Sequence, residues 1–173
     1  MGVSKQSLHL RALEPSDLDF LYTLENDQDL WAVSNTLVPF SRYTLEQYIA
    51  HAREDIYSAK QQRFVLTNAD QHPLGCIDLY DFDPQHHRAG VGLVIQKNYR
   101  GKGYAKVALA LIEDVAFGPL QLHQLYAGVG EDNTTSIQLF QSMGYEQTGL
   151  KKDWNFHNKV YNNELIFQKI AHV

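Results

Sequence analysis

The sequence contains little cysteine, no excess of positive charge and no long hydrophobic run. Cys76 is the only cysteine in 173 residues, so no disulfide can form within the chain, as is usual in a reducing compartment. A formal net charge of -5 argues against a general affinity for nucleic acid. The N-terminal residues lack the apolar core of a signal peptide, and no later segment is apolar over the length that spans a bilayer. These absences predict a cytoplasmic protein without nucleic-acid or membrane partners.

The composition is that of a folded protein. Hydrophobic residues make up 44% of the chain and aromatic residues 12%, which is enough for a core in a chain of this length. Cys76 lies in the apolar, strand-like run PLGCIDLY, where a small buried hydrophobic residue is a better interpretation than a catalytic thiol. No linker, repeat or low-complexity tract interrupts the chain, so we predict one domain over residues 1–173.

Two hydrophobic periods follow one another along the chain. Alternating residues predict strands at 8–12, three within 63–95, one at 122–129 and a hairpin formed by 150–156 and 160–167. Helical spacing predicts helices that begin near Ser16, Thr44, Tyr104 and Thr134, the first two at capping boxes with Asp19 and Gln47. We interpret residues 26–42 as an irregular lid or a short helix. The resulting order, β, α, α, β, β, β, α, β, α, β, β, predicts a mixed α/β domain.

The stretch YRGKGYAKVALALI places two glycines among three basic residues, immediately before an apolar helix. Gly101 and Gly103 have no Cβ, so the backbone can turn tightly and approach a ligand closely. The N–H groups at the start of the helix, with the positive end of its dipole, form a ready site for a phosphate or a similar anion. Glycines and lysines also serve turn geometry and solubility, so the stretch alone leaves both interpretations open.

Two motifs at matching spacing carry a resemblance to a known family. The pyrophosphate loop of the GCN5-related N-acetyltransferase (GNAT) superfamily, Gln or Arg, two variable residues, Gly, one variable residue, Gly or Ala, is matched by RGKGYA at residues 100–105. The superfamily's second signature, an Asn followed by an apolar helix ending in Gly-aromatic, is similar to NTTSIQLFQSMGY. Within the superfamily, the stretch from Phe64 to Ala105 resembles the spermidine N-acetyltransferases most, followed by the ribosomal-protein alanine N-acetyltransferases.

The resemblance implies a fold, a reaction and a cosubstrate. The fold would be α/β (α+β), a single GNAT domain with a mixed, mostly antiparallel central sheet flanked by helices. The reaction would be direct attack of an amine on the thioester of acetyl-CoA, with polarisation of the carbonyl by a backbone N–H. Acetyl-CoA would contact three groups of residues: the strand residues Leu93, Val94 and Ile95; the loop and helix residues Arg100, Gly101, Lys102, Gly103, Tyr104, Ala105 and Lys106; and Asn133, Thr134 and Thr135. An N-cap role is equally expected for Asn133.

The catalytic positions of the polyamine enzymes are not retained. Phe140 stands where those enzymes carry the tyrosine that protonates the departing thiolate, and Gly90 stands where they carry a glutamate base. Tyr145, Tyr126 and Ser136 are candidate replacements for the acid, although Tyr145 also fits a core position.

Two aspartates of the third strand are candidate substrate residues. Asp78 and Asp81 are three residues apart in CIDLYDFD, so we expect them to face opposite sides of that strand or to lie at its end. The resemblance makes Asp81 the candidate that binds an ammonium or relays a proton, although a role as a strand-ending turn residue is equally open. His86 and His87 lack the third ligand that zinc needs, so we predict no metal.

Three functions remain open at this stage. The leading hypothesis is acetylation of a primary amine, in particular a polyamine or diamine such as spermidine, because an acidic protein suits a cationic small molecule. A protein N-terminus or another small amine is the alternative acceptor. With Phe140 and Gly90 at the acid and base positions, a non-catalytic acyl-CoA sensor is the third hypothesis. A homo-oligomer is possible.

Overall fold

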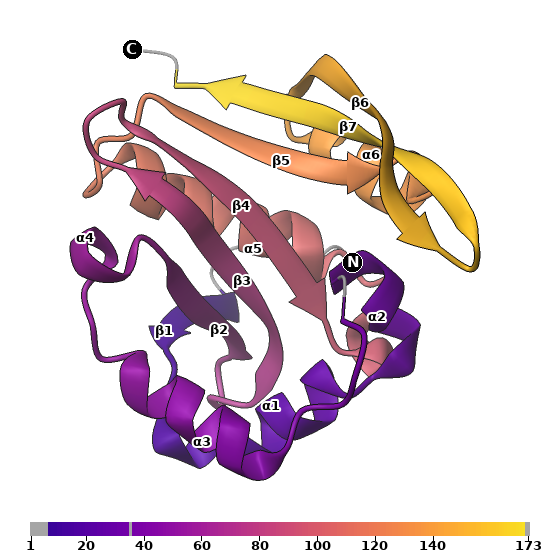
Figure 1. Ribbon diagram of the computed structural model, residues 1–173. Coiled ribbons are helices and arrows are strands. Elements are labelled where there is room, and N and C mark those ends of the chain that lie inside the picture. Colours follow the sequence, from indigo (N-terminus) through magenta and orange to yellow (C-terminus); the bar gives the residue numbers. More distant parts are fainter. Residues whose placement is uncertain (1–6, 35, 172–173) are drawn as a thin grey trace.

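A computed structural model describes residues 7–34 and 36–171 of the chain (Figure 1). The strands are β1 (Leu8–Ala12), β2 (Gln62–Asn68), β3 (Pro73–Asp83), β4 (Arg88–Ile95), β5 (Gln124–Gly130), β6 (Glu146–His157) and β7 (Val160–Ile170). The helices are α1 (Leu18–Glu25), α2 (Gln28–Ser34), α3 (Arg42–His51), α4 (Ile56–Ala59), α5 (Tyr104–Phe117) and α6 (Thr134–Ser142), with 3₁₀ turns at Pro15–Asp17 and Lys97–Tyr99. No helix in these residues combines the length and apolarity needed to cross a membrane.

The described strands form one sheet in the order β1-β2-β3-β4-β5-β7-β6. Every neighbouring pair is antiparallel except β4 and β5, which run parallel with α5 as their crossover. The predicted mixed, mostly antiparallel sheet is therefore confirmed, and each predicted strand is present. β7 follows β6 in the chain but lies between β5 and β6, because it pairs with both.

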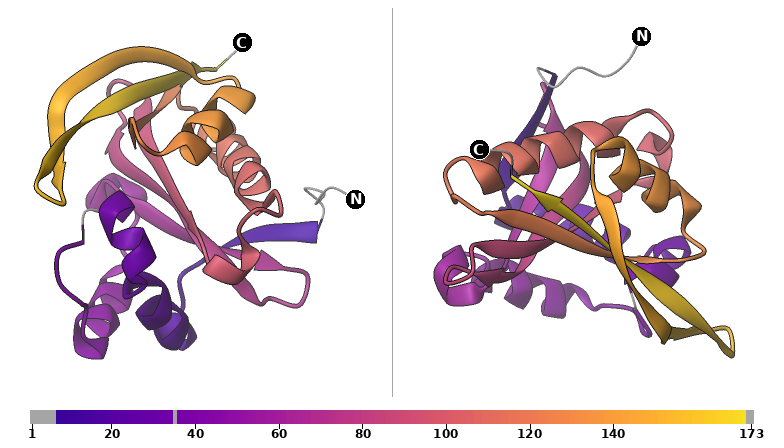
Figure 2. Two further views of the ribbon diagram at one scale, coloured as in Figure 1. Left: turned by 90° about the vertical axis from the view of Figure 1, so that its right-hand side faces the viewer. Right: turned by 90° about the horizontal axis from the view of Figure 1, so that it is seen from above.

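Helices cover both faces of the first half of the sheet, as the left view of Figure 2 shows. On one face, the buried residues Leu109 and Ile112 of α5 belong to the same core as Ile77 of β3 and Val91 of β4. On the other face, α1 and α3 bury leucines and an isoleucine over Val65 and Cys76. The alternation of β2, β3 and β4 thus divides their side chains between two cores.

The helix starts differ from the predicted capping boxes. Glu14, rather than Ser16, caps the first turn and forms the box with Asp17, because Pro15 occupies the position where its missing N–H costs nothing. Ser41, rather than Thr44, is the N-cap of α3, and its side chain accepts the N–H of Thr44 at 3.0 Å.

The predicted helix near Thr44 is followed by a separate short helix. α3 ends at His51, and the short helix α4 begins at a separate N-cap, Asp55. The segment expected to be an irregular lid or a short helix contains α2.

Side-chain hydrogen bonds and positive φ values define the turns between the strands. The side chain of Asn68 accepts the N–H groups of Asp70 and His72, and that of Asp83 accepts those of Gln85 and His86. In the final hairpin, Asn158 and Lys159 have φ values of 50° and 64°, as a two-residue type I′ turn requires.

Candidate acetyl-transfer site

The two parallel strands in the middle of the sheet separate after three residues. β4 pairs with β5 only from Arg88 to Gly90, whereas it continues to pair with β3 as far as Ile95 (Figure 1). Residues 91–95 therefore present to β5 an edge without ladder hydrogen bonds. Such an edge can pair with the amides of an extended ligand, which then lies in the sheet like a strand. The predicted contacts Leu93, Val94 and Ile95 lie on it.

The glycine loop lies between the end of β4 and the start of α5. Gly101 and Gly103 have φ values of 72° and 84°, which L side chains rarely adopt, and a Cβ at either position would meet nothing within 4 Å. Gly103 is the N-cap of α5 but supplies no side-chain cap, and the first turn contains no acidic residue. No side chain therefore caps the first N–H groups of α5, the arrangement that binds phosphate.

The basic residues around this loop differ in their availability. The guanidinium of Arg100 donates to the carbonyl of Ile95 at 2.9 Å and to the carboxylate of Asp27 at 3.2 Å, so it ties the loop to β4 and to the segment before α2. The ammonium of Lys102 lies 5.6 Å from the centre of the Tyr99 ring. Lys102 is therefore the better placed of the two side chains to contact an anion above the glycines.

α6 begins on the other side of the separated strands. The side chain of Asn133 accepts the N–H of Ser136 at 3.1 Å, so the N-cap role expected for Asn133 is observed. Thr134 and Thr135 form the first turn. Whether these three residues also contact acetyl-CoA stays a prediction.

The aromatic residues near the C-terminal end of α6 belong to the core. Phe140 is buried, with its ring 5.0 Å from that of Tyr145 and 6.1 Å from that of Phe167. Burial, together with the neighbouring Glu113, raises the pKa of Tyr145. The phenol of Tyr145 is thus enclosed and hard to ionise, so it is unsuited to replace the missing acid.

Tyr80 explains why β4 carries a glycine at position 90. The Tyr80 ring lies across Gly90, where a Cβ would stand 2.2 Å from a ring carbon, and it is in edge contact with the Tyr126 ring of β5. A glutamate at position 90 would collide with this ring. Tyr80 therefore spans β4 where the strands separate. The sequence carried a signal for it, because Gly90 and Gly92 alternate in AGVGLV and leave one face of a strand open to a neighbouring side chain.

An irregularity in β3 redirects Asp81. The register shifts between Tyr80 and Asp83, and Asp81 has a φ of 48°. Its carboxylate accepts the hydroxyl of Tyr126 at 3.3 Å, and the Tyr126 and Tyr80 rings are in edge contact. Asp81 consequently lies on the same face as Tyr80. Of the two expected arrangements, opposite faces of β3 or a position at its end, the second applies to Asp81, which lies two residues before the end of β3, because the irregular strand does not alternate there.

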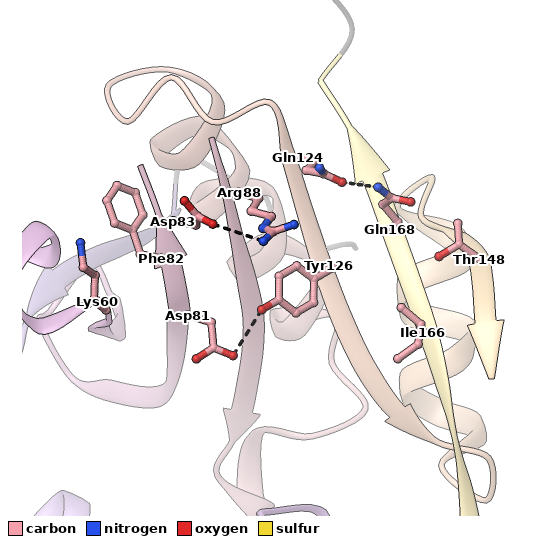
Figure 3. A pocket seen from close by; sticks show the side chains of 10 residues that line it. All are labelled: Lys60, Asp81, Phe82, Asp83, Arg88, Gln124, Tyr126, Thr148, Ile166 and Gln168. Atoms are coloured by element: carbon pink, nitrogen blue, oxygen red, sulfur yellow. Dashed lines mark hydrogen bonds and ion pairs between the residues drawn. The ribbon is translucent and has the colours of Figure 1, made fainter. Parts of the chain in front are cut away.

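Asp81 lines a pocket of about 790 Å³ on this face of the sheet (Figure 3). Its other lining residues come from β3, β4, β5, β6, β7 and the end of α4: Lys60, Phe82, Asp83, Arg88, Gln124, Tyr126, Thr148, Ile166 and Gln168. Arg88 neutralises Asp83 across 3.2 Å, whereas no cation lies within 4.0 Å of Asp81 in the described part of the chain. Burial, followed by the charge of Asp81, raises the pKa of Tyr126 to about 12.

Asp78 already has a partner. The guanidinium of Arg63 donates to both its carboxylate oxygens, at 2.7 and 2.9 Å, and also contacts Glu25. This ion pair joins β2, β3 and α1 beneath the Tyr48 ring. The substrate role predicted for Asp78 would require breaking it.

Burial or local hydrogen bonds account for the remaining candidate residues. Cys76 is buried, and burial raises the pKa of its thiol, so it has the character of a small core residue. The N–H of His86 donates to Asp83, and a ring nitrogen of His87 lies 3.1 Å from the carbonyl of Gln121. Among residues 7–34 and 36–171, no three His, Cys, Asp or Glu side chains form a metal-binding group.

Comparison with known proteins agrees with this geometry. A family model described as an acetyltransferase (GNAT) domain matches residues 7–146. The chain belongs to this family. As a GNAT protein with an open glycine loop and a separated β4–β5 pair, it is an acetyl-CoA-dependent N-acetyltransferase.

Relatives within the GNAT family include two spermidine N(1)-acetyltransferases. The enzyme of Escherichia coli K12 is 29% identical over 175 residues, covering 95% of this chain and 88% of the relative. The enzyme of Vibrio cholerae is 28% identical over 157 residues, covering 90% and 88%. A crystal structure of the Vibrio cholerae spermidine N-acetyltransferase in complex with CoA and spermine superposes with a TM-score of 0.88 at 25% identity, over 95% of this chain and 96% of that one. The predicted superfamily and cosubstrate are confirmed.

Proposed function

We propose that the enzyme transfers the acetyl group of acetyl-CoA to a polyamine or a diamine such as spermidine. The observation that carries this proposal is the carboxylate of Asp81, which lines the pocket beside the separated strands and, in the described part of the chain, has a neutral hydroxyl as its only hydrogen-bond partner. A carboxylate that lines a pocket without a paired cation favours a ligand that brings one. The spermidine N-acetyltransferases among the relatives support the same class of acceptor.

The cosubstrate would be held by three parts of the chain. The N–H groups from Gly101 to Ala105 would bind the pyrophosphate, with Lys102 and Lys106 adding positive charge and Arg100 securing the loop. The open edge of β4 at Leu93, Val94 and Ile95 would pair with the amides of the pantetheine arm. Acetyl-CoA supplies the thioester carbonyl, and an N–H of this edge would polarise it.

The chain would help the leaving thiolate little. Phe140 cannot donate a proton, and Tyr145 is enclosed beside Glu113. A thiolate is a tolerable leaving group near its pKa, so the absence of an acid lowers the rate by a factor on the order of 10² to 10⁴ at most. With glycine at position 90, water is the simplest acceptor of the proton that the attacking amine loses.

A screen of acceptors tests the proposal directly. We expect thiol release from acetyl-CoA in the presence of spermidine, spermine or 1,4-diaminobutane, and little release with a peptide that has a free N-terminus. Release with the peptide alone would move the acceptor to proteins. Tight binding of acetyl-CoA without release by any amine would contradict the proposed acceptors.

The role of Asp81 is tested by Asp81→Asn. Loss of a charge-assisted hydrogen bond should raise KM for spermidine roughly ten- to a hundredfold without changing the affinity for acetyl-CoA. Asp83→Asn is the matched control, because Arg88 already neutralises Asp83 and an Asn can keep the turn. Equal KM values for the two variants would leave Asp81 as a turn residue.

We also propose that the protein is cytoplasmic and assembles into a homo-oligomer. The Vibrio cholerae spermidine N-acetyltransferase has been described as dodecameric, and its structure superposes on this chain with a TM-score of 0.81 at 26% identity.

A further inference from the structure

A second carboxylate lies closer to the point where the strands separate. Glu164 precedes Ile166 by two residues on β7, so it faces the same side as Ile166 and Gln168 in Figure 3. It extends over Gly128 of β5, where a Cβ would stand 2.7 Å from Oε1. Tyr126 is the last residue of β5 that pairs with β4, and Gly128 lies two positions beyond it. The side chain of Glu164 is only 15% exposed, so its charge is partly enclosed at the mouth of the separation.

Tyr80 bounds the same place from the other strand. Its ring covers Gly90 and is in edge contact with the Tyr126 ring. Burial, followed by the charges of Asp81 and Glu164, raises the pKa of Tyr80. The side chains that meet at the separation are therefore a neutral phenol, which lies over Gly90, and a carboxylate, which lies over Gly128.

The carboxylate of Glu164 already holds a primary ammonium from the chain itself. Nζ of Lys151 donates to Oε1 of Glu164 at 2.9 Å and lies 4.4 Å from the ring of Trp154. Four residue steps along β6, from Lys151 to Asn155, lie opposite two steps along β7, from Glu164 to Asn162, and Asp153 within this stretch of β6 has a φ of 49°. This bulge brings Trp154 to the same side as Lys151, although three positions normally reverse the side.

A carboxylate and an aromatic face around an aliphatic ammonium are the parts of an amine-binding site. We infer that Glu164 and Trp154 form the subsite for the acceptor's ammonium nearest the transferred acetyl group, and that Lys151 occupies this subsite until an amine displaces it. The inference rests on the proposed function, since it concerns an amine acceptor. Lys151 is 41% exposed and can leave without disturbing the core. Glu164 and Trp154 are thus specificity residues, and Lys151 is an internal competitor.

The alternative is that Lys151 and Glu164 only stabilise the hairpin. The two roles differ in what Lys151→Met should do, because methionine keeps the aliphatic chain and removes the ammonium. If Lys151 competes with the acceptor, Lys151→Met should lower KM for spermidine and 1,4-diaminobutane several-fold and leave the affinity for acetyl-CoA unchanged. If the pair only stabilises the hairpin, Lys151→Met should lower thermal stability and leave KM unchanged.

Steady-state kinetics of Lys151→Met, Glu164→Gln and the double variant test the inference. Glu164→Gln should raise KM about ten- to a hundredfold, and in its presence Lys151→Met should have no further effect on KM. Arg42→Met is the matched control, because Arg42 also pairs with a carboxylate, Asp19, and lies over a ring, 4.5 Å from the centre of Tyr22. An unchanged KM for spermidine in folded Glu164→Gln would overturn the inference. The proposed function would still stand if the parent enzyme acetylates spermidine.

Two further measurements cover the remaining outcomes. If Glu164→Gln does not fold, Trp154→Leu replaces it, because Trp154 is 58% exposed, and a KM equal to that of the parent would overturn the inference. If the parent acetylates no amine, the proposed function fails, and calorimetric titration of spermidine into its complex with CoA decides the subsite. Binding that Glu164→Gln abolishes supports the subsite, and equal binding by parent and variant overturns it.

Discussion

At the scale of single residues, the glycine loop allows a charge to be tested without a steric change. A Cβ at Gly103 meets nothing within 4 Å, so Gly103→Asp and Gly103→Asn both fit, and both must adopt the same left-handed φ. Only the aspartate opposes a pyrophosphate above the helix N-terminus. We expect calorimetry to show acetyl-CoA binding at least tenfold weaker in Gly103→Asp than in Gly103→Asn. Equal affinities would remove the phosphate-binding role from this loop.

Gly90 and Tyr80 form a close cross-strand pair between β4 and β3. Gly90→Ala places a Cβ 2.2 Å from the Tyr80 ring, and overpacking of this kind costs about 1–3 kcal/mol. Gly92→Ala is the matched control, because its Cβ would lie 3.7 Å from the same ring, an ordinary contact. Urea denaturation should show the larger loss for Gly90→Ala, and most of it should vanish in a Tyr80→Ala background. A loss that persists there would mean that the ring is not the obstacle.

Phe140→Tyr tests whether the missing acid matters. The substitution adds a hydroxyl to a ring at the position where the polyamine enzymes carry the thiolate's proton donor, so we expect kcat to be maintained or raised. Tyr145→Phe should leave kcat unchanged, because the enclosed phenol of Tyr145 takes no part. If Phe140→Tyr binds acetyl-CoA normally but turns over more slowly, Phe140 serves to shape the site and the argument from the missing acid is incorrect.

Residue patterns predicted the cosubstrate side better than the acceptor side. The glycines directly precede the apolar helix α5 and Asn133 directly precedes α6, so the local geometry at both helix starts follows from local rules. Asp81, Tyr126 and Glu164 come from three strands, and the irregularities in β3 and β6 reverse the side that simple alternation assigns. Side chains that meet through such bulges cannot be grouped from spacing alone.

At the scale of elements, the start of α1 depends on one enclosed carboxylate. Asp17 is buried, accepts two hydrogen bonds from the Arg11 guanidinium at 2.7 Å and caps the N–H of Glu14 at 2.9 Å. Burial alone would raise the pKa of Asp17, but these hydrogen bonds outweigh it and hold the pKa below its ordinary value of 3.8. The ion pair between Arg11 and Asp17 thus joins β1 to the start of α1.

The lowered pKa of Asp17 predicts how stability depends on pH. The stabilisation is present above the unfolded-state pKa and is lost as the pH falls through the lower folded-state pKa. Asp17→Asn should therefore reduce the free energy of unfolding by about 2 kcal/mol at neutral pH, and the difference from the parent should shrink below pH 3.8. Urea denaturation of parent and variant at neutral pH and below pH 3.8 measures this difference. Asp19→Asn, which alters an exposed pair, is the control and should change little.

Element order was predictable because strands and helices have different periods, and every predicted strand is present. The helix starts were not, because the observed N-caps, Glu14 and Ser41, lack the residue pattern that pointed to Ser16 and Thr44. Several polar residues near a helix start compete for one set of N–H groups. In the first case Asp17 also pairs with Arg11 of β1, six residues earlier, and a capping pattern does not include that contact.

At the scale of the whole molecule, the hairpin of β6 and β7 extends beyond the body of the sheet (Figure 1). Phe156, Val160 and Tyr161 near its tip are 61%, 57% and 61% exposed, although they are apolar or aromatic. Such a surface suits a second copy of the chain, in keeping with the proposed homo-oligomer. We expect light scattering to give a mass above that of one chain, and Phe156→Ser with Tyr161→Ser to lower it.

Leu37→Ser is the control for this prediction, because Leu37 is 87% exposed in the connection between α2 and α3 and is not part of the hairpin. A monomeric parent protein, or an assembly that survives both hairpin substitutions, would contradict the role of the tip.

The insertion of β7 between β5 and β6 sets an order of events during synthesis. The ribosome delivers the glycine loop and α5 first, whereas Ile166 and Gln168 of the pocket follow roughly 60 residues later. At about 5–20 residues per second this interval lasts on the order of several seconds. Until β7 arrives, β5 pairs with β4 over three residues among the described strands, and one edge of β5 and both edges of β6 stay open to wrong partners. The growing chain therefore completes the glycine loop, proposed to bind the pyrophosphate, before the pocket proposed to select the amine, and it is most exposed to aggregation in between.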